Sequence, residues 1–325
     1  MRTDDEIGGY LTIESNENND IFRSEDIFVN TGRNALELIL ENITNITTLY
    51  ISKFTCDVIM EPINKLNLHI KFYSIDKNLE IAEELKLRDE EYLLYTNYFG
   101  VKDKYIATLN NIYRGNLIID NAQALMSKIK TTGPQFFSPR KFIGLADGGI
   151  VRGIKDFDKS KYNTDVSYKR YTHLLKRIDF DAQSAYKDFL YNESTLIGQG
   201  IKNMSKLTFT MIKNTDINYI RDVRHSNFNY LHKNLKMSNK LNIDNFGDFE
   251  CPMIYPYYSH DENLRQRLIT NKIYVATYWP NVFQWSREDS IEYKLATNLI
   301  PIPIDQRYGI KEMQTIIKTI NNNEQ

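Results

Sequence analysis

The first half of the chain alternates between short apolar runs and segments whose apolar residues recur at helical spacing. Apolar runs typical of strands occupy 48–52, 69–75, 91–99 and 117–120. Helical patterns occupy 33–43, 56–66, the charged stretch 76–90 and the segment between 100 and 117. This alternation predicts an α/β fold whose large lobe has a mainly parallel sheet flanked by helices.

Residues that follow the predicted strands are candidates for a binding site. In α/β folds, ligands gather beyond the carboxyl ends of the parallel strands. Phe54 and Thr55 follow the first run, Asn97 to Gly100 follow EYLLY, and Asp120 closes the run LIID. We therefore expect these three groups at one edge of the sheet.

The second half of the chain has a different pattern. A strand-like run at 148–154 precedes long helical stretches, and an apolar stripe ending at Leu235 with Asp216 as its cap predicts a helix over about 216–235. Short strands at 250–259 and 272–280, a helix at 263–271 and a final amphipathic helix then predict a smaller α+β lobe. We expect a large ligand-binding domain at 1–215, followed by an interdomain helix and a small C-terminal domain at 216–325.

Composition excludes several classes of function. Lys+Arg 41 against Asp+Glu 42 leaves a net charge of -1, so no basic surface for nucleic acid is expected. The chain has neither an apolar signal region nor a membrane-length apolar stretch, which predicts a cytoplasmic protein without a membrane partner. The two cysteines, Cys56 and Cys251, lie far apart, and the histidines have no ligand spacing, so neither a disulfide nor a metal site is expected.

One lysine stands out in the window 136–151, FFSPRKFIGLADGGIV. Lys141 lies among apolar and small residues, with Ser138 before it and Gly148 and Gly149 after it. An amine held at a desolvated turn can act as a nucleophile and form a Schiff base. A solvated loop lysine is the alternative that this window alone favours.

Asp120 and the segment TGRNAL at 31–36 favour the Schiff-base lysine over the solvated loop lysine. A buried aspartate needs a cationic partner, and pyridoxal phosphate (PLP) uses a lysine for its aldehyde and an aspartate for its protonated ring nitrogen. The glycine turn at Gly32 opens a helix and could bind the phosphate, with Ser138 as a hydroxyl donor, although a plain helix cap is the alternative there. These residue types together point to PLP chemistry.

With these residues in place, the chain resembles the fold type I PLP-dependent enzymes and, more narrowly, the DegT/StrS-like sugar aminotransferases. The matching segments occur in the family's order: NTGRNALELIL, SKFTCD, TNYFG, IIDNAQAL and FSPRKFIGLADGG. In the C-terminal part, 253–280 and 298–320 resemble the family's closing strands and ending. The resemblance thus covers nearly the whole chain.

The resemblance implies roles for individual residues. Lys141 would be the lysine that forms the aldimine with PLP, and Asp120 would be the partner of the pyridine nitrogen. Gln123 would lie near the cofactor ring and its phenolic oxygen. The cofactor-binding residues expected on this basis are Gly32, Arg33, Asn34, Thr55, Cys56, Asp120, Gln123, Ser138 and Lys141.

The chain also departs from the family pattern. Arg33 replaces the usual threonine, and it could clamp the phosphate, take a substrate carboxylate or be a surface charge. Phe136 occupies the position of the usual serine, so we expect Ser138 to bind the phosphate instead. Cys56 stands where an aromatic residue often stacks on the ring. Phe54 or Tyr98 could substitute for it, and a role in the core is the alternative for each.

The resemblance implies an aminotransferase that moves an amino group from an amino acid, commonly glutamate, to a keto sugar that is typically nucleotide-linked. The presence of Lys141 favours transamination over the related sugar dehydratases, which have a histidine there. A homodimer working in polysaccharide biosynthesis is expected. The alternative is a non-catalytic relative of the same fold that binds a sugar or a partner protein.

Overall fold

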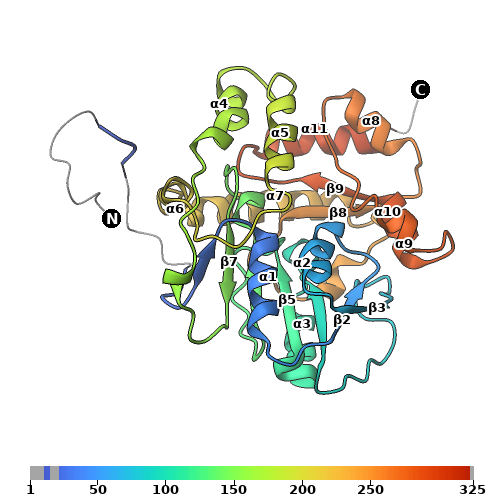
Figure 1. Ribbon diagram of the computed structural model, residues 1–325. Helices are drawn as coiled ribbons and strands as arrows, with labels where there is room; N and C mark the ends of the chain where they lie inside the picture. The colour runs from blue at the N-terminus through green and yellow to red at the C-terminus, as the bar shows by residue number, and fades with distance from the viewer. Residues whose placement is uncertain (1–10, 15–21, 323–325) are drawn as a thin grey trace.

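A seven-stranded sheet forms the centre of the large lobe, with strand order β1-β7-β6-β5-β4-β2-β3 (Figure 1). The computed structural model describes residues 11–14 and 22–322. Strands β2 to β6 pair in parallel, whereas β7 is antiparallel to both β6 and β1. The strands are β1 (Ile27–Val29), β2 (Thr48–Ser52), β3 (His69–Tyr73), β4 (Glu91–Thr96), β5 (Leu117–Asn121), β6 (Gln135–Phe137) and β7 (Gly149–Arg152).

Both faces of this sheet are covered, which explains why its strands are continuous apolar runs rather than alternating ones. Successive side chains of a strand point to opposite faces. In β4, Leu93 and Tyr95 therefore join one apolar cluster and Leu94 joins the other, and all three are buried. The predicted α/β fold with a mainly parallel sheet is confirmed.

Helices α1 (Gly32–Asn42) and α2 (Met60–Lys65) contribute to the cluster on one face. Helix α3 (Asp103–Tyr113) and the long α7 (Ile217–Leu235) contribute to the cluster on the other. As expected, Asp216 caps α7, because its Oδ1 accepts the Tyr219 N–H at 2.9 Å. The remaining helices of the large lobe are α4 (Thr172–Asp179), α5 (Tyr186–Thr195) and α6 (Lys206–Lys213).

The C-terminal part forms a smaller α+β unit around the antiparallel strands β8 (Ile254–Tyr258) and β9 (Leu299–Pro303). Its apolar residues belong to the same cluster as those of α3 and α7. The boundary between residues 215 and 216 stays a prediction. The helices of this part are α8 (Leu264–Thr270), α9 (Val282–Trp285), α10 (Ile291–Asn298) and α11 (Ile310–Asn321). Among the described residues, we find no helix with the length and apolarity that a membrane span needs.

Two predicted elements are wrong. The charged stretch 76–90 forms turns instead of a helix. Asp76 Oδ1 accepts the N–H groups of Asn78 and Glu80 at 2.8 and 3.0 Å, and such side-chain bonds compete with helix formation. The segment 272–280 is not a strand, because helix α8 takes some of its backbone groups: the Ile273 N–H donates to the Leu268 carbonyl at 2.9 Å.

The two adjacent glycines pack against the turn that begins α1. A Cβ atom at Gly149 would lie 2.1 Å from the Thr31 carbonyl oxygen, far inside van der Waals contact. Gly148 has φ +111°, a conformation that side chains rarely adopt, and its N–H donates to the Asn30 carbonyl at 2.7 Å. The glycine pair therefore allows the strand β7 to approach the start of α1.

We predict that Gly149→Ala lowers the free energy of unfolding by about 2–3 kcal/mol, because the added methyl group must displace backbone. Gly144→Ala is the matched control, since a Cβ at Gly144 would meet nothing within 4 Å. Urea unfolding of both variants measures the difference. Equal stability of the two variants would contradict the packing described here.

Candidate active site

The carboxyl ends of six strands lie at one edge of the sheet, β3 among them because it pairs in parallel with β2. Strands β2, β4, β5 and β6 are parallel neighbours, and β1 runs in the same direction because both β1 and β6 are antiparallel to β7. Polar contacts join adjacent ends: Thr55 Oγ1 lies 3.3 Å from Thr96 Oγ1, and the Asn97 N–H donates to the Asp120 carbonyl at 2.9 Å. This edge brings together Phe54 and Thr55, Asn97 and Asp120, as their positions after strands indicate.

The start of α1 and Ser138 lie against one another beside this edge, and we call this polar junction the recess. The Thr31 hydroxyl caps the helix by accepting the Asn34 N–H at 3.1 Å, and the Arg33 N–H makes no hydrogen bond within the described residues. A Cβ at Gly32 would lie 3.3 Å from Ser138 Cβ and 3.5 Å from its Oγ, so Ser138 lies directly against the helix start. A free amide at a helix N-terminus next to a hydroxyl suits a phosphate group.

The Ser138 hydroxyl itself makes no hydrogen bond in the part of the chain that the structure describes, although the residue is only 6% exposed. Phe136, two residues earlier, lies in the core of the sheet and pairs in register with Asp120 and Val151. Of the two positions, only Ser138 therefore presents a polar side chain to the recess.

Lys141 lies one short turn after Ser138, and its N–H donates to the Ser138 carbonyl at 3.2 Å. The residue is exposed, as a loop lysine would be, and its ammonium group has no ion pair or hydrogen bond within 22–322. The Lys141 ammonium group nevertheless lies close enough to Asp120 and Cys56 to lower the pKa of each. This effect opposes the rise in pKa that burial causes. An unpaired lysine thus stands beside a buried carboxylate.

Asp120 is the buried carboxylate of the site, with an exposed fraction of 7%. Burial raises its pKa above the usual value, and the attraction of Lys141 and the Ala122 N–H, which donates to Oδ1 at 2.8 Å, oppose the rise. Such a carboxylate is stabilised by a cation placed against it. A protonated ring nitrogen would be such a cation.

The Arg33 side chain forms an ion pair within the fold, and the functional roles considered for it stay predictions. Its Nη1 donates to Glu61 Oε2 at 2.7 Å, and its side chain is 13% exposed. Glu61 Oε1 in turn accepts the Gly198 N–H at 2.9 Å. The guanidinium group therefore joins α1, α2 and the loop after α5.

The side chains of Asn34 and Gln123 are engaged within the fold. Asn34 Nδ2 donates to Glu37 Oε2 at 3.0 Å and to the Gln199 carbonyl at 2.8 Å. Gln123 Oε1 accepts the Phe99 N–H at 2.9 Å, which holds the turn after β4. Their contacts with a cofactor stay a prediction.

The segment after β2 supplies no aromatic face for a cofactor ring. Phe54 and Tyr98 are 0% exposed, and the Tyr98 hydroxyl donates to the Phe54 carbonyl at 2.9 Å. Both are core aromatics, and the Phe54 ring packs edge-on against Trp279 with centroids 5.0 Å apart. Burial raises the pKa of the Cys56 thiol, and the charge of Lys141 opposes the rise. Contacts of Thr55 and Cys56 with a cofactor stay a prediction.

Two residues that the sequence patterns did not single out contact the lysine turn. The guanidinium of buried Arg224, on α7, lies over the Phe142 ring, 4.7 Å from its centroid. Gln306 Nε2 donates to the Phe142 carbonyl at 2.9 Å. Both partners lie far from Lys141 in the sequence, so only their distance in space reveals the contact.

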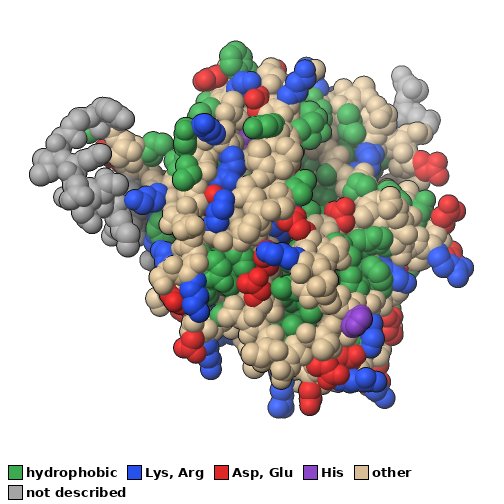
Figure 2. All heavy atoms as spheres, viewed as in Figure 1, with side chains coloured by type: hydrophobic (Ala, Val, Ile, Leu, Met, Phe, Trp, Pro, Cys, Tyr) green, Lys and Arg blue, Asp and Glu red, His purple; other side chains and the backbone are tan. Residues whose placement is uncertain are grey.

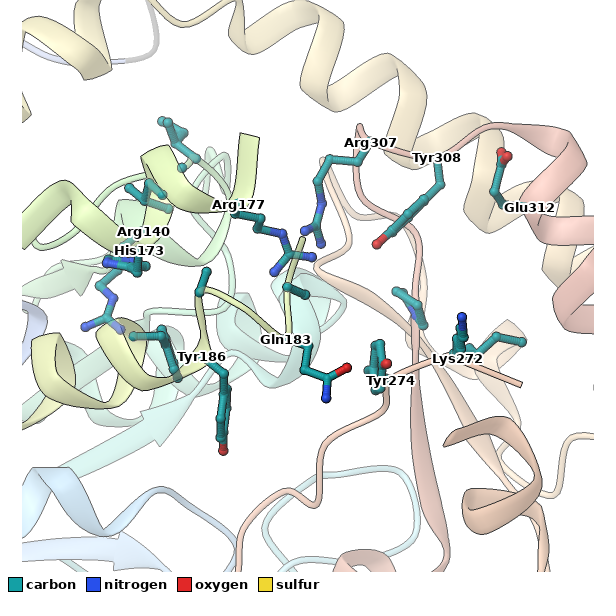
Figure 3. Close-up of a pocket in the computed structure, with 18 of the residues that line it drawn as sticks. Arg140, His173, Arg177, Gln183, Tyr186, Lys272, Tyr274, Arg307, Tyr308 and Glu312 are labelled. Carbon is teal, nitrogen blue, oxygen red and sulfur yellow. The ribbon is translucent and has the colours of Figure 1, made fainter. Parts of the chain in front are cut away.

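A cavity of about 1010 Å³ opens next to the same turn (Figure 3). Its walls come from four separate stretches: 140–145, helices α4 and α5, 272–274 and 303–316. The stretch 140–145 belongs to the window of Lys141, but the four stretches adjoin only in the folded chain, so the sequence did not indicate the cavity. The residues that the structure describes contain no cluster of three or more side chains that could hold a metal ion.

The sequence matches no protein-family model and no curated protein. Its structure is similar to the sugar aminotransferase CalS13 from Micromonospora echinospora, with 13% identity and a TM-score of 0.63 over 92% of this chain and 88% of the other. It is also similar to a DegT DnrJ EryC1 StrS aminotransferase from Brucella abortus, with 12% identity and a TM-score of 0.59 over 91% and 85%.

A third similar structure is Spr1654 from Streptococcus pneumoniae, which is solved in a PLP-form and in a PMP-form. The PLP-form has 13% identity and a TM-score of 0.61 over 91% of this chain and 86% of the other. At identities this low, the likeness shows the fold alone. The chain thus has the fold of these aminotransferases with a strongly divergent sequence.

We predict that Asp120→Asn makes the cofactor-free protein more stable than the wild type at neutral pH, and that the difference shrinks toward pH 4. The raised pKa means that the unfolded carboxyl ionises first as the pH rises. The folded wild type therefore loses stability from the unfolded pKa, near 3.9, up to the folded pKa, and the loss is constant above it.

Urea midpoints between pH 4 and 7.5 measure this effect. Asp89→Asn, at an exposed position, is the control and should show no growing difference. A stability difference for Asp120→Asn that does not change with pH would contradict the burial effect.

Proposed function

We propose that the protein is a PLP-dependent aminotransferase. The observation that carries the proposal is the unpaired Lys141 beside the buried Asp120, at the same sheet edge as the recess formed by Gly32 and Ser138. The likeness to sugar aminotransferases, one of them solved with PLP and PMP, supports it.

The residues present fit this cofactor. The Ser138 hydroxyl and the Arg33 N–H, neither of which has a partner within 22–322, would hold the phosphate. Asp120 would hold the protonated ring nitrogen, and that cation would lower the pKa of Asp120 toward its ordinary range. Bound PLP would supply an electron sink for the α-carbon of the amino donor and a carrier for its amino group.

Lys141 would hold the cofactor and then act as the acid and base of the reaction. Its Nζ would take the proton from the α-carbon of the amino donor and return a proton on the other side of the transfer. The side chain is exposed at a turn that Arg224 and Gln306 hold through Phe142. A fixed backbone with a free side chain is what a group that moves between two atoms requires.

The substrates are proposed from the family resemblance. The amino donor would be an amino acid, with glutamate the first choice, and the acceptor a keto sugar linked to a nucleotide, used in polysaccharide biosynthesis in the cytoplasm. The second candidate is a non-catalytic relative that binds a sugar or a partner protein. It is favoured by Arg33 and Gln123, whose side chains make hydrogen bonds within the fold.

We predict that the purified protein takes up PLP and becomes yellow, and that borohydride then attaches the cofactor to Lys141. Lys141→Ala should abolish the attachment, because its side chain has no amine, whereas Lys86→Ala, at an exposed position remote from the site, should not. Visible absorption and peptide mass spectrometry measure the two effects. In a separate sample that has not been reduced, glutamate should bleach the absorption band.

The same measurements separate the two candidate functions. A colourless protein that takes up no added PLP would exclude the aminotransferase and support the non-catalytic candidate. A yellow protein that no amino donor bleaches would be a PLP protein without transaminase activity.

We further propose that the protein is a homodimer whose copies meet through the hairpin of α4 and α5. Large apolar side chains are exposed on and beside this hairpin (Figure 2). Ile178, Phe180 and Tyr191 are 80%, 71% and 71% exposed. Apolar residues grouped in this way mark interaction surfaces, and a second copy of the chain is the partner that the resemblance implies.

We predict that Ile178→Glu converts the dimer to a monomer at micromolar concentration, because a charge would have to be buried in the interface. Ile112→Glu is the control, because Ile112 is 62% exposed on α3, away from the hairpin. Light scattering after size exclusion measures the mass. A wild-type monomer, or a dimer that Ile178→Glu leaves intact, would refute this interface.

A further inference from the structure

Helix α5 contacts both ends of the segment that carries the candidate PLP lysine. This segment, residues 139–147, is the lysine turn. At one end of it, Glu193 on α5 forms an ion pair with Arg140. At the other end, Asn192 Nδ2 donates to the Ala146 carbonyl at 2.8 Å. Two consecutive residues of one helix therefore bracket the lysine.

The Asn192 side chain is polar at a position where burial disfavours a polar group. The residue is 2% exposed, and its Oδ1 has no hydrogen-bond partner among the residues described. A buried acceptor without a partner lowers stability. A leucine of similar size would avoid that loss but could not donate to the Ala146 carbonyl. A local rule broken in this way points to a role in a site.

The backbone of the lysine turn is fixed by hydrogen bonds in its first half and contains a glycine in its second. The Phe142 and Ile143 N–H groups both donate to the Pro139 carbonyl at 2.9 Å. Gly144 is exposed, and a Cβ atom there would meet nothing within 4 Å. Glycine adopts a wider range of backbone angles than other residues. The hydrogen bond from Asn192 therefore restrains the half of the turn that has the most freedom.

The opposite side of the α4–α5 hairpin faces a cavity of about 1010 Å³ that separates it from the small lobe (Figure 3). Arg177 of α4 and Arg307 of the segment after β9 point toward one another across this cavity (Figure 3). Like charges repel, so this pair does not draw the hairpin toward the small lobe. The contacts of α5 with the lysine turn act on the hairpin from the other side, and the positions of the two segments therefore depend on one another.

We propose that Asn192 and Glu193 are positioning residues for Lys141. They hold the backbone on both sides of the lysine and so set where its amine can reach. A misplacement of about 1 Å can slow a reaction about 100-fold, even when the cause lies away from the reacting atoms. The inference rests on the proposed function in so far as Lys141 is the residue that attaches PLP.

Hydrogen exchange of the cofactor-free, full-length protein measures the positioning directly. Exchange of the Phe142 and Ile143 amides reports opening of the turn, because both donate within it. Asn192→Leu retains the size of the side chain and removes the donor. We expect exchange of the peptide 140–147 to become about tenfold faster, the effect of losing one buried hydrogen bond. Exchange in the buried strand β5 should change less than about twofold, whereas a purely stabilising role would speed up both.

Glu193→Gln tests the other end of the turn. The Glu193 side chain is 36% exposed, so this variant folds even if Asn192→Leu does not. We expect about threefold faster exchange of the same peptide, the size of a partly exposed ion pair. Asn116→Ala is the matched control, because Asn116 Nδ2 donates to the Asp89 carbonyl at 3.0 Å at the opposite edge of the sheet. It should leave exchange of the lysine turn unchanged.

Cofactor titrations give a second readout. PLP bonds to a lysine amine through its aldehyde with loss of one water, whereas pyridoxamine phosphate has no aldehyde and cannot form this bond. We expect Asn192→Leu to weaken PLP about tenfold and to leave pyridoxamine phosphate unchanged. Unchanged exchange of the turn in both variants, or equal weakening of the two cofactors, would overturn the proposal.

The exchange measurement does not need PLP. Faster exchange of the turn in both variants of a protein that never takes up PLP would support the positioning and refute the proposed aminotransferase. A yellow, glutamate-reactive protein whose turn exchanges alike in all variants would do the reverse.

Discussion

Parallel pairing of β2, β4, β5 and β6 is the constraint on which the rest of the structure depends. Parallel strands place all their carboxyl ends at one edge and need a covering layer on each face. The covering layers account for the two apolar clusters, to which α1 and α2 contribute on one face and α3 and α7 on the other. The shared edge accounts for the site, because residues from separate strands meet there without any motif that links them.

The antiparallel strand β7 adds a second constraint to the same edge. It returns between β6 and β1, and its first residue, Gly149, touches the Thr31 carbonyl at the start of α1. This approach holds Ser138 and Gly32 together on either side of the recess. The double glycine therefore shapes the site through packing, although neither glycine contributes a functional group.

The negative charge of Asp120 at the sheet edge is not fully compensated by neighbouring groups. Burial raises the pKa of Asp120, and only the exposed Lys141 and the Ala122 N–H oppose the rise. Elsewhere in the fold, buried carboxylates have close partners, as Asp26 does in its two bonds with Arg152 at 2.7 Å. A cationic ligand gains the most binding free energy beside a negative charge that is incompletely compensated.

The sequence by itself determined the alternation of strands β2 to β5 with helices, the cap at Asp216 and the residues of the sheet edge, because these depend on local periodicity and on the ends of apolar runs. It did not determine the coil at 76–90, where hydrogen bonds to the Asp76 side chain outweigh the helical pattern. Nor did it determine that 272–280 forms no strand. Only the tertiary structure decided that Arg33 pairs with Glu61, that Phe54 and Tyr98 lie in the core, and that Arg177 faces Arg307. Each of these joins residues remote in the chain, and their proximity follows from packing rather than from spacing.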